Sequence, residues 1–112
     1  MPPTAPDRGH LIWIDFSPHA GHEQGGRRPG LIVSPALFNA NSKFALACPV
    51  TSKVKGYPYE VAIPDGLPLK GVILCDQLKS LDWVARNAVY ICDLPAEVMD
   101  EVLARIRPLF ED

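Results

Sequence analysis

One loop of the chain concentrates side chains that could do chemistry on a phosphate group. Residues 21–30, GHEQGGRRPG, place Glu23, Arg27 and Arg28 among glycines, between two apolar runs. The segment is far longer than the two residues that a tight hairpin needs. A planar guanidinium fits a phosphate, and a neighbouring carboxylate can accept or donate a proton. The loop is therefore a candidate site, and an exposed Glu–Arg pair on a flexible hairpin is the alternative interpretation.

Two further segments offer polar groups near the ends of apolar runs. The residues TSKVK (51–55) bring hydroxyls and cations together after one such run, and Asp76 and Gln77 follow another. Each signal is weak by itself, because Thr is common in strands and because Asp and Gln often satisfy backbone groups in turns. These two segments support a functional site only if the fold brings them close to the loop at 21–30.

The charge of the chain is unevenly distributed. The net charge is only −2, yet Glu23 is the only acidic residue between Ser17 and Lys55, a segment with five Lys and Arg residues. Residues 93–112 hold six acidic residues against two arginines. A polyanion would be attracted to the basic segment, and an ordinary solvated face is the alternative.

The composition indicates one globular domain. With 112 residues the chain is long enough for a single core, and we assign residues 9–112 to one domain and expect residues 1–8 to be disordered. No apolar stretch is long enough to span a membrane, and the first residues lack the pattern of a signal peptide, so we expect a cytoplasmic protein. Cys48, Cys75 and Cys92 lie in apolar runs and are predicted to be buried free thiols. No ligand set has metal-binding spacing, so neither a metal nor a cofactor is predicted.

The elements that must position these residues are mostly strands. Apolar runs bounded by turn residues occur at 9–16, 29–35, 43–52, 57–64, 70–81 and 88–94. Pro49 suggests an edge or a bulge near the end of the third run. This spacing is typical of an antiparallel sheet that is closed or curled into a small barrel.

The end of the chain has a different periodicity. Within 94–110, apolar residues recur at three- and four-residue spacings, at Val98, Val102, Ile106 and Leu109. This pattern predicts a C-terminal helix packed on the sheet, which should fray at Pro108.

Together, the segments GHLIWIDFSP, GHEQGGRRPGLIVSP, CPVTSK, KGYPYEV and CDQLKSLDW resemble, in order and spacing, the MazF/PemK family of toxin endoribonucleases. The resemblance runs from about Gly9 to the C-terminal helix. It implies a mainly β fold with α, an SH3-like, MazF/CcdB-type antiparallel β-barrel with a C-terminal helix, forming a homodimer. It also implies an mRNA interferase that cleaves single-stranded RNA at short motifs and is neutralised by a cognate, MazE-like antitoxin.

The resemblance also implies roles for individual residues. By position, the family's essential arginine falls on Arg28, its loop glutamate on Glu23, and its active-site threonine or serine on Thr51. We expect Glu23 to act as general base, Arg28 to stabilise the phosphorane and Thr51 to position the phosphate, while the ribose 2′-OH attacks without a metal. The products would be a 2′,3′-cyclic phosphate and a 5′-OH. The residues expected to contact RNA are Gln24, Arg27, Ser52, Lys53, Lys55, Gln77, Lys79 and Arg86.

Aromatic side chains could stack on the bases of single-stranded RNA. The candidates are Trp13, Phe16, Tyr57, Tyr59 and Trp83. Strand aromatics usually face the core, so we expect most of them to be buried.

Two other functions stay open. The CcdB branch of the superfamily binds DNA gyrase without hydrolysing anything, which would depend on the C-terminal helix. A homologue without catalytic activity could serve as an RNA-binding or regulatory module. The presence of Glu23, Arg28 and Thr51 together favours the nuclease.

Overall fold

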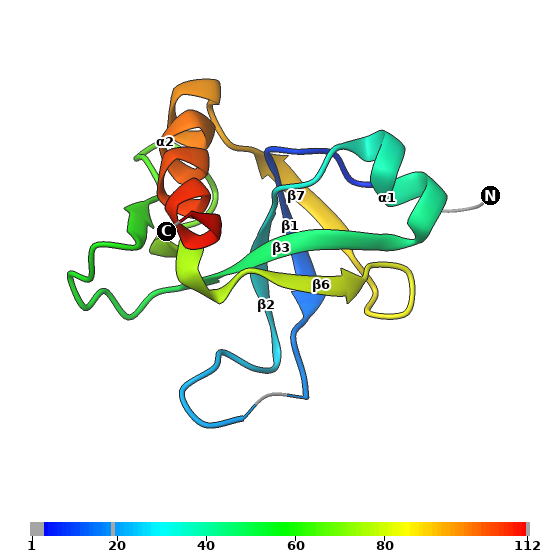
Figure 1. Cartoon of the computed structure of the whole chain (residues 1–112), viewed down its shortest axis with the longest axis horizontal. Helices are drawn as coiled ribbons and strands as arrows, with labels where there is room; N and C mark the ends of the chain where they lie inside the picture. Colours follow the sequence, from blue (N-terminus) through cyan, green and yellow to red (C-terminus); the bar gives the residue numbers. More distant parts are fainter. Residues whose placement is uncertain (1–3, 19, 112) are drawn as a thin grey trace.

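A computed structural model describes residues 4–18 and 20–111, and a seven-stranded antiparallel sheet forms its centre (Figure 1). The strands are β1 (His10–Asp15), β2 (Arg27–Ile32), β3 (Phe44–Thr51), β4 (Glu60–Ala62), β5 (Val72–Leu74), β6 (Lys79–Asp82) and β7 (Val89–Asp93). Hydrogen-bonded neighbours follow the order β4-β5-β3-β2-β1-β7, and β6 pairs with β3. The predicted antiparallel sheet is confirmed, but within the described residues no pairing joins β4 to β7 to close a barrel.

The β1–β2 hairpin carries the candidate loop away from the sheet, at the bottom of Figure 1. Ile14 lies opposite Arg28 and Asp15 opposite Arg27. β2 therefore begins two residues before the run that was predicted to be a strand. As a result, the backbones of Arg27 and Arg28 are fixed in the sheet, and the loop proper ends before them.

The central strand β3 changes partner along its length. Residues 44–47 pair with β6, whereas Val50 and Thr51 pair with β5. Pro49 lies between the two pairings and faces Gly30 of β2. The proline therefore sits inside the central strand and not at an edge. Its missing N–H is tolerated there because neither the β5 ladder nor the β6 ladder includes residue 49.

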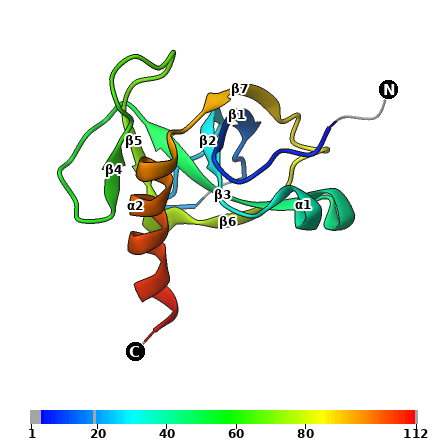
Figure 2. The ribbon, with the colours of Figure 1, turned by 90° about the horizontal axis from the view of Figure 1, so that it is seen from above.

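The predicted C-terminal helix is present as α2 (Ala96–Ile106), followed by a 3-10 turn, η2 (Arg107–Phe110), where Pro108 interrupts the α-helix. Met99, Val102 and Ile106 are buried against the sheet. Burial of each such side chain stabilises the fold by about 1.5–3 kcal/mol. Figure 2 shows α2 beside β4 and β5, with the short helix α1 (Ala36–Ser42) at the opposite end of the molecule.

The helix α1 was not predicted from the sequence, since residues ALFNANS carry no amphipathic repeat. Tertiary contacts hold it in place through Asn39, which is fully buried. The Asn39 side chain accepts a hydrogen bond from Ser34 Oγ at 2.6 Å and donates to the Pro6 carbonyl at 2.8 Å. The indole of Trp83 donates to the Asn39 carbonyl at 2.8 Å. A buried polar network of this kind depends on partners far along the chain and has no local sequence signal.

Two further segments differ from expectation. The run at 70–81 forms two strands, β5 and β6, separated by a 3-10 turn, η1 (Cys75–Gln77). Residues 4–8 are not free of contacts: Pro6 is buried and Arg8 Nε donates to the Val33 carbonyl at 2.6 Å. Residues 1–3, also expected to be disordered, lie outside the described residues. Among the described residues, no helix has the length and apolar character that crossing a membrane requires.

Candidate active site

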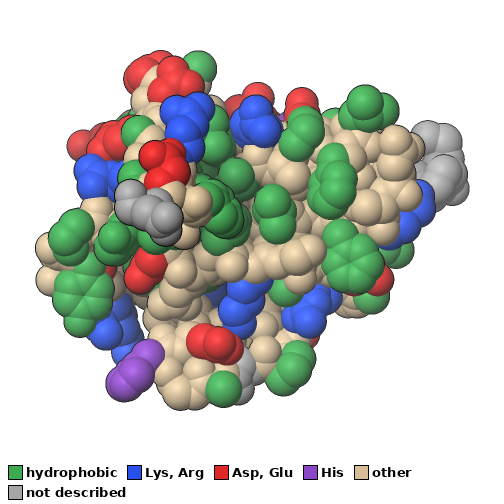
Figure 3. Space-filling model, viewed as in Figure 1, with side chains coloured by type: hydrophobic (Ala, Val, Ile, Leu, Met, Phe, Trp, Pro, Cys, Tyr) green, Lys and Arg blue, Asp and Glu red, His purple; other side chains and the backbone are tan. Residues whose placement is uncertain are grey.

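A groove of about 820 Å³ lies between the β1–β2 hairpin, the end of β3, the 52–59 loop and η1. Eight of the eleven predicted site residues line it: Gln24, Arg27, Arg28, Thr51, Ser52, Lys53, Lys55 and Gln77. Lys70, which the sequence did not single out, adds another cation to the lining. Figure 3 shows acidic side chains over α2 at the upper left, and Lys and Arg side chains toward the β1–β2 loop at the bottom. Five Lys and Arg residues and two carboxylates line the groove, so it is cationic although the whole chain is mildly acidic.

The guanidinium of Arg28 is anchored by its inner nitrogen. Arg28 Nε donates to the Gly25 carbonyl at 2.9 Å, and the side chain is partly buried. Within the described residues, no hydrogen bond occupies its two terminal nitrogens. The hairpin thus fixes the direction of the guanidinium and leaves its outer donors available to an oxyanion.

Thr51, at the end of β3, is oriented by the start of the loop that follows it. Its side-chain oxygen accepts a hydrogen bond from the Lys53 N–H at 3.2 Å, and only 8% of the residue is exposed. Because the oxygen acts as an acceptor here, its proton is free to be donated into the groove. Gly71 packs directly on the Thr51 backbone, where a Cβ on residue 71 would come within 2.3 Å of the Thr51 carbonyl oxygen.

Glu23 does not line the groove. Its carboxylate accepts hydrogen bonds from the Ala20 N–H at 3.0 Å and from Lys79 Nζ at 3.1 Å. Lys79 thus lies on the loop side of the groove, paired with Glu23, and it does not contribute to the lining. The neighbours of Glu23 in the chain, His22 and Gln24, do line the groove. In this structure the Glu23 carboxylate is therefore engaged outside the groove lining.

Arg86 also lies outside the groove lining. Its guanidinium donates to the carbonyls of Asp15, at 3.0 Å, and of Ser17. These contacts hold the base of the β1–β2 loop against the turn that precedes β7. In this structure the side chain anchors the loop that carries the candidate site.

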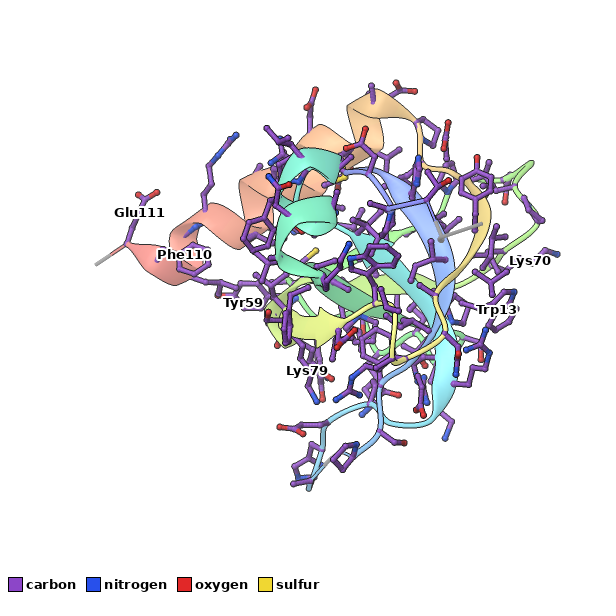
Figure 4. The ribbon with its side chains drawn as sticks, turned by 90° about the vertical axis from the view of Figure 1, so that its right-hand side faces the viewer. Trp13, Tyr59, Lys70, Lys79, Phe110 and Glu111 are labelled. Carbon is purple, nitrogen blue, oxygen red and sulfur yellow. The ribbon has the colours of Figure 1, made fainter. Side chains whose placement is uncertain are left out.

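The expectation that most of the five aromatic candidates are buried is wrong, because two of them are buried and three are exposed. Phe16 and Trp83 are buried, with 0% and 3% of their surfaces exposed. Trp13 and Tyr57 are exposed and line the groove, and Lys55 Nζ lies 5.7 Å from the centre of the Tyr57 ring. Figure 4 shows Trp13 and Lys70 close together on one side of the molecule, with Tyr59 on the other side. The sequence could not separate the two groups, because which face of a strand is buried depends on the packing of the sheet.

Two carboxylates line the groove besides the predicted residues. Glu60 accepts hydrogen bonds from the backbone N–H groups of Lys55 and Gly56, the latter at 2.9 Å, and so closes the 52–59 loop. Asp76 is exposed and is the middle residue of η1. The position of Asp76 beside Gln77 in the sequence was the available signal for its proximity to the groove.

Two buried thiols lie behind the groove without lining it. Burial raises the pKa of the Cys48 thiol far above its usual range and that of Cys75 to about 12. Both cysteines are therefore protonated near neutral pH and do not act as nucleophiles. Cys92, predicted to be buried, is partly exposed, and all three cysteines are free. Across residues 4–18 and 20–111, no group of three His, Cys, Asp or Glu side chains is arranged to hold a metal ion.

Comparisons with known proteins identify the family of the chain. A family model described as the PemK-like, MazF-like toxin of type II toxin-antitoxin systems matches residues 7–110. The chain is 41% identical over 104 residues to the endoribonuclease toxin MazF of Escherichia coli, and the match covers 93% of each protein.

Solved structures give the same assignment. The chain is similar to the crystal structure of MazF from Deinococcus radiodurans, with a TM-score of 0.93 and 49% identity over 96% of this chain and 98% of that one. It is also similar to a chain of the MazE–MazF complex from the same organism, with a TM-score of 0.85 and 50% identity over 95% and 96% of the two chains. On the combined evidence of sequence and fold, the chain belongs to the PemK-like, MazF-like family of type II toxins.

Proposed function

We propose that this endoribonuclease toxin cleaves single-stranded RNA at a short sequence motif, without a metal ion, through attack of the ribose 2′-OH on the adjacent phosphate. The observation that carries the proposal is that Arg28 and Thr51 line one cationic groove, each with donors available to an oxyanion. A cyclising reaction needs this arrangement, because negative charge develops on the phosphorane and no external nucleophile is required.

The steps follow from the residues present. Glu23 must leave Lys79 and enter the groove to accept the proton of the 2′-OH. The 2′ oxygen forms a bond to phosphorus as the bond to the 5′ oxygen breaks. Arg28 stabilises the charge on the phosphorane, and the Thr51 hydroxyl donates to a non-bridging oxygen. The leaving 5′ oxygen takes up a proton, for which His22 in the groove lining is the candidate donor. The products are a 2′,3′-cyclic phosphate and a 5′-OH.

The shape of the groove supports a single-stranded substrate. Trp13 and Tyr57 offer exposed ring faces beside cations, and unpaired bases can stack on such rings. Arg27, Lys53 and Lys55 would follow the phosphates, as would Ser52, Gln24 and Gln77 through hydrogen bonds. Lys79 and Arg86 would contact RNA only outside the groove.

We further propose that the cationic groove is where a MazE-like antitoxin segment competes with RNA, in a protein that acts as a homodimer in the cytoplasm, where RNA is available. The solved complex of MazE with MazF from Deinococcus radiodurans supports a partner of this kind. An acidic segment of the antitoxin would bind the groove by charge complementarity. Unchanged RNA cleavage by a saturated complex would refute the competition.

The test is cleavage of a long mixed-sequence RNA by the wild type and by Arg28→Ala, with EDTA present and fragment ends mapped. Arg107→Ala is the matched control, because Arg107 is an exposed arginine on η2 that does not line the groove. We expect cuts at one motif with 5′-OH ends for the wild type and the control, and a loss of about 10²-fold or more for Arg28→Ala.

Other outcomes separate the alternatives. Cleavage that requires a divalent ion, or that persists when the ribose at the cut site lacks its 2′-OH, would exclude the proposed mechanism. A folded wild type that cuts no RNA would favour a gyrase-binding toxin or an RNA-binding homologue without activity.

A further inference from the structure

The 52–59 loop carries part of the groove lining without a packed core beneath it. All eight of its residues are exposed, and it extends from the end of β3 to the start of β4, at the left of Figure 1. The residues that it contributes to the lining are Ser52, Lys53, Lys55 and Tyr57. Because the loop buries little apolar surface, its conformation depends on the hydrogen bonds that its backbone makes.

Local hydrogen bonds close the loop on itself. The N–H groups of Lys55 and Gly56 donate to the Glu60 carboxylate, and the Glu60 N–H donates to the Tyr57 carbonyl at 3.1 Å. All of these partners lie within five residues of one another in the chain. The bonds therefore shape the loop but do not fix its direction relative to η1 and α2.

Two long-range hydrogen bonds join the end of the loop to the rest of the fold. The Cys75 N–H of η1 donates to the Tyr59 carbonyl at 3.0 Å. The preceding carbonyl, that of Pro58, accepts a hydrogen bond from Arg105 Nη1 of α2. Because two different elements hold two consecutive carbonyls, the peptide unit between them cannot rotate freely. Within the described residues, no other side chain from outside residues 51–60 donates a hydrogen bond to this loop.

The helix orients the guanidinium that reaches the loop. Arg105 Nη2 pairs with Glu101 Oε1 at 3.0 Å, one turn earlier on α2, and 36% of the Arg105 side chain is exposed. Its Nε is buried and makes no hydrogen bond within the described residues. A buried donor without a partner is unfavourable for folding, so helix stability alone does not account for this placement. The placement does supply a charged donor to the Pro58 carbonyl.

We propose that Arg105, on α2 and outside the groove lining, is a positioning residue that holds the 52–59 loop in its RNA-binding conformation. The inference rests on the proposed ribonuclease function. A loop that is ordered before RNA arrives does not have to lose its conformational freedom on binding, and this loss weakens association for every long side chain that is immobilised. Arg105 contacts no substrate and acts on RNA through Lys53, Lys55 and Tyr57.

The first test compares Arg105→Ala with Arg107→Ala, which removes an exposed arginine two residues later that does not line the groove. We expect Kd for a 2′-deoxy oligonucleotide, which lacks the nucleophile, to rise about 5- to 50-fold in Arg105→Ala and to stay unchanged in Arg107→Ala. For RNA, KM should rise by a similar factor and kcat should fall less than about threefold, because Arg28 and Thr51 belong to β2 and β3 and not to the loop. Arg105→Lys keeps one charged donor and should recover part of the loss.

Two further measurements separate positioning from other roles. Amide hydrogen exchange at Lys55 and Gly56 should be faster in Arg105→Ala than in the wild type, with exchange in β1 and β2 unchanged. The slope of log Kd against log salt concentration should be unchanged in Arg105→Ala, whereas Lys53→Ala should reduce it by about 1 if that lysine contacts a phosphate. Should Arg105→Ala not fold, Glu101→Gln, which weakens the pair that orients Arg105, should change Kd and loop exchange in the same direction.

The outcomes distinguish this inference from the proposed function. If a folded Arg105→Ala binds and exchanges like the wild type while RNA is still cleaved, the inference is wrong and the proposed function stands. A reduced salt slope in Arg105→Ala would place Arg105 on a phosphate and overturn the positioning role. Faster exchange throughout the sheet with unchanged Kd would show that Arg105 only stabilises the fold. If the wild type neither binds nor cleaves RNA, the proposed function fails, and loop exchange alone decides whether Arg105 orders the loop.

Discussion

Replacement of Gly71 by alanine should destabilise the protein and displace Thr51 in the groove. The residue adopts a φ of +124°, which side-chain-bearing residues rarely adopt, and a Cβ would lie 2.3 Å from the carbonyl oxygen and 2.9 Å from the carbonyl carbon of Thr51. Both contacts are with backbone atoms, so the neighbour cannot move aside by changing rotamer. The unusual φ costs about 1–3 kcal/mol, and a steric clash in a packed region costs about as much again. Together they should lower the free energy of unfolding by about 2–6 kcal/mol.

The same substitution should lower activity in the protein that remains folded. Relief of the clash requires the Thr51 carbonyl to move, and this shift changes the direction of a hydroxyl that the Lys53 N–H orients. A displacement of about 1 Å at a positioning group costs about 10²-fold in rate. We therefore expect kcat/KM for RNA to fall by about 10- to 100-fold at a temperature where the variant is folded.

Gly66→Ala provides the matched control. Gly66 has a φ of +94°, but a Cβ at this position would contact nothing within 4 Å. It should therefore incur only the conformational cost and leave cleavage unchanged. Urea unfolding followed by circular dichroism gives the free energies, and cleavage of a fluorescent RNA gives the rates. Equal destabilisation of Gly71→Ala and Gly66→Ala, or full activity in Gly71→Ala, would refute the steric argument.

Three other predictions concern stacking, loop anchoring and pH. Binding of a 2′-deoxy oligonucleotide should quench the fluorescence of exposed Trp13 and leave that of buried Trp83 unaffected. Trp13→Phe should therefore lose the quenching, and Trp13→Leu should bind the oligonucleotide about 5- to 100-fold more weakly. Quenching that persists in Trp13→Phe would contradict this prediction. Arg86→Ala should lower the free energy of unfolding by about 1–3 kcal/mol, because the Arg86 guanidinium donates hydrogen bonds to two loop carbonyls. The same variant should leave the salt dependence of RNA binding unchanged. A weaker salt dependence would instead indicate that Arg86 contacts a phosphate. Backbone hydrogen bonds from Ala36 and Arg8 lower the pKa of the Asp7 carboxyl below its usual 3.8, so its stabilising effect is present above pH 3.8 and is lost as pH falls through the lowered value. The difference in urea midpoint between the wild type and Asp7→Asn should therefore shrink below about pH 4. A difference that grows there would exclude this role.

The sequence predicted the elements whose signals are local. The period of the apolar residues predicted the C-terminal helix, because the spacing that marks one helix face is visible in the chain itself. The alternation in residues 10–15 predicted β1, and the Gly-rich segment predicted a functional loop on the hairpin. The resemblance of the motifs to the MazF/PemK family predicted that Arg28 and Thr51 belong to one site.

Tertiary structure alone decided what depends on contacts between distant residues. The helix α1 exists because Asn39 satisfies its hydrogen bonds with Ser34, Pro6 and Trp83, and no local pattern encodes such a network. Which aromatic residues face the groove depends on the packing of both sheet faces, so Trp13 could not be separated from Trp83 in advance.

The roles of individual charged groups were likewise decided by their partners in space. Lys79 and Arg86 lie outside the groove because one pairs with Glu23 and the other anchors the loop through its carbonyls, whereas Asp76 has no such partner among the described residues. The sequence determined which residue types could take part in the chemistry. The fold determined which of their polar groups are left free to do so, because a hydrogen bond made within the protein is no longer available to a substrate.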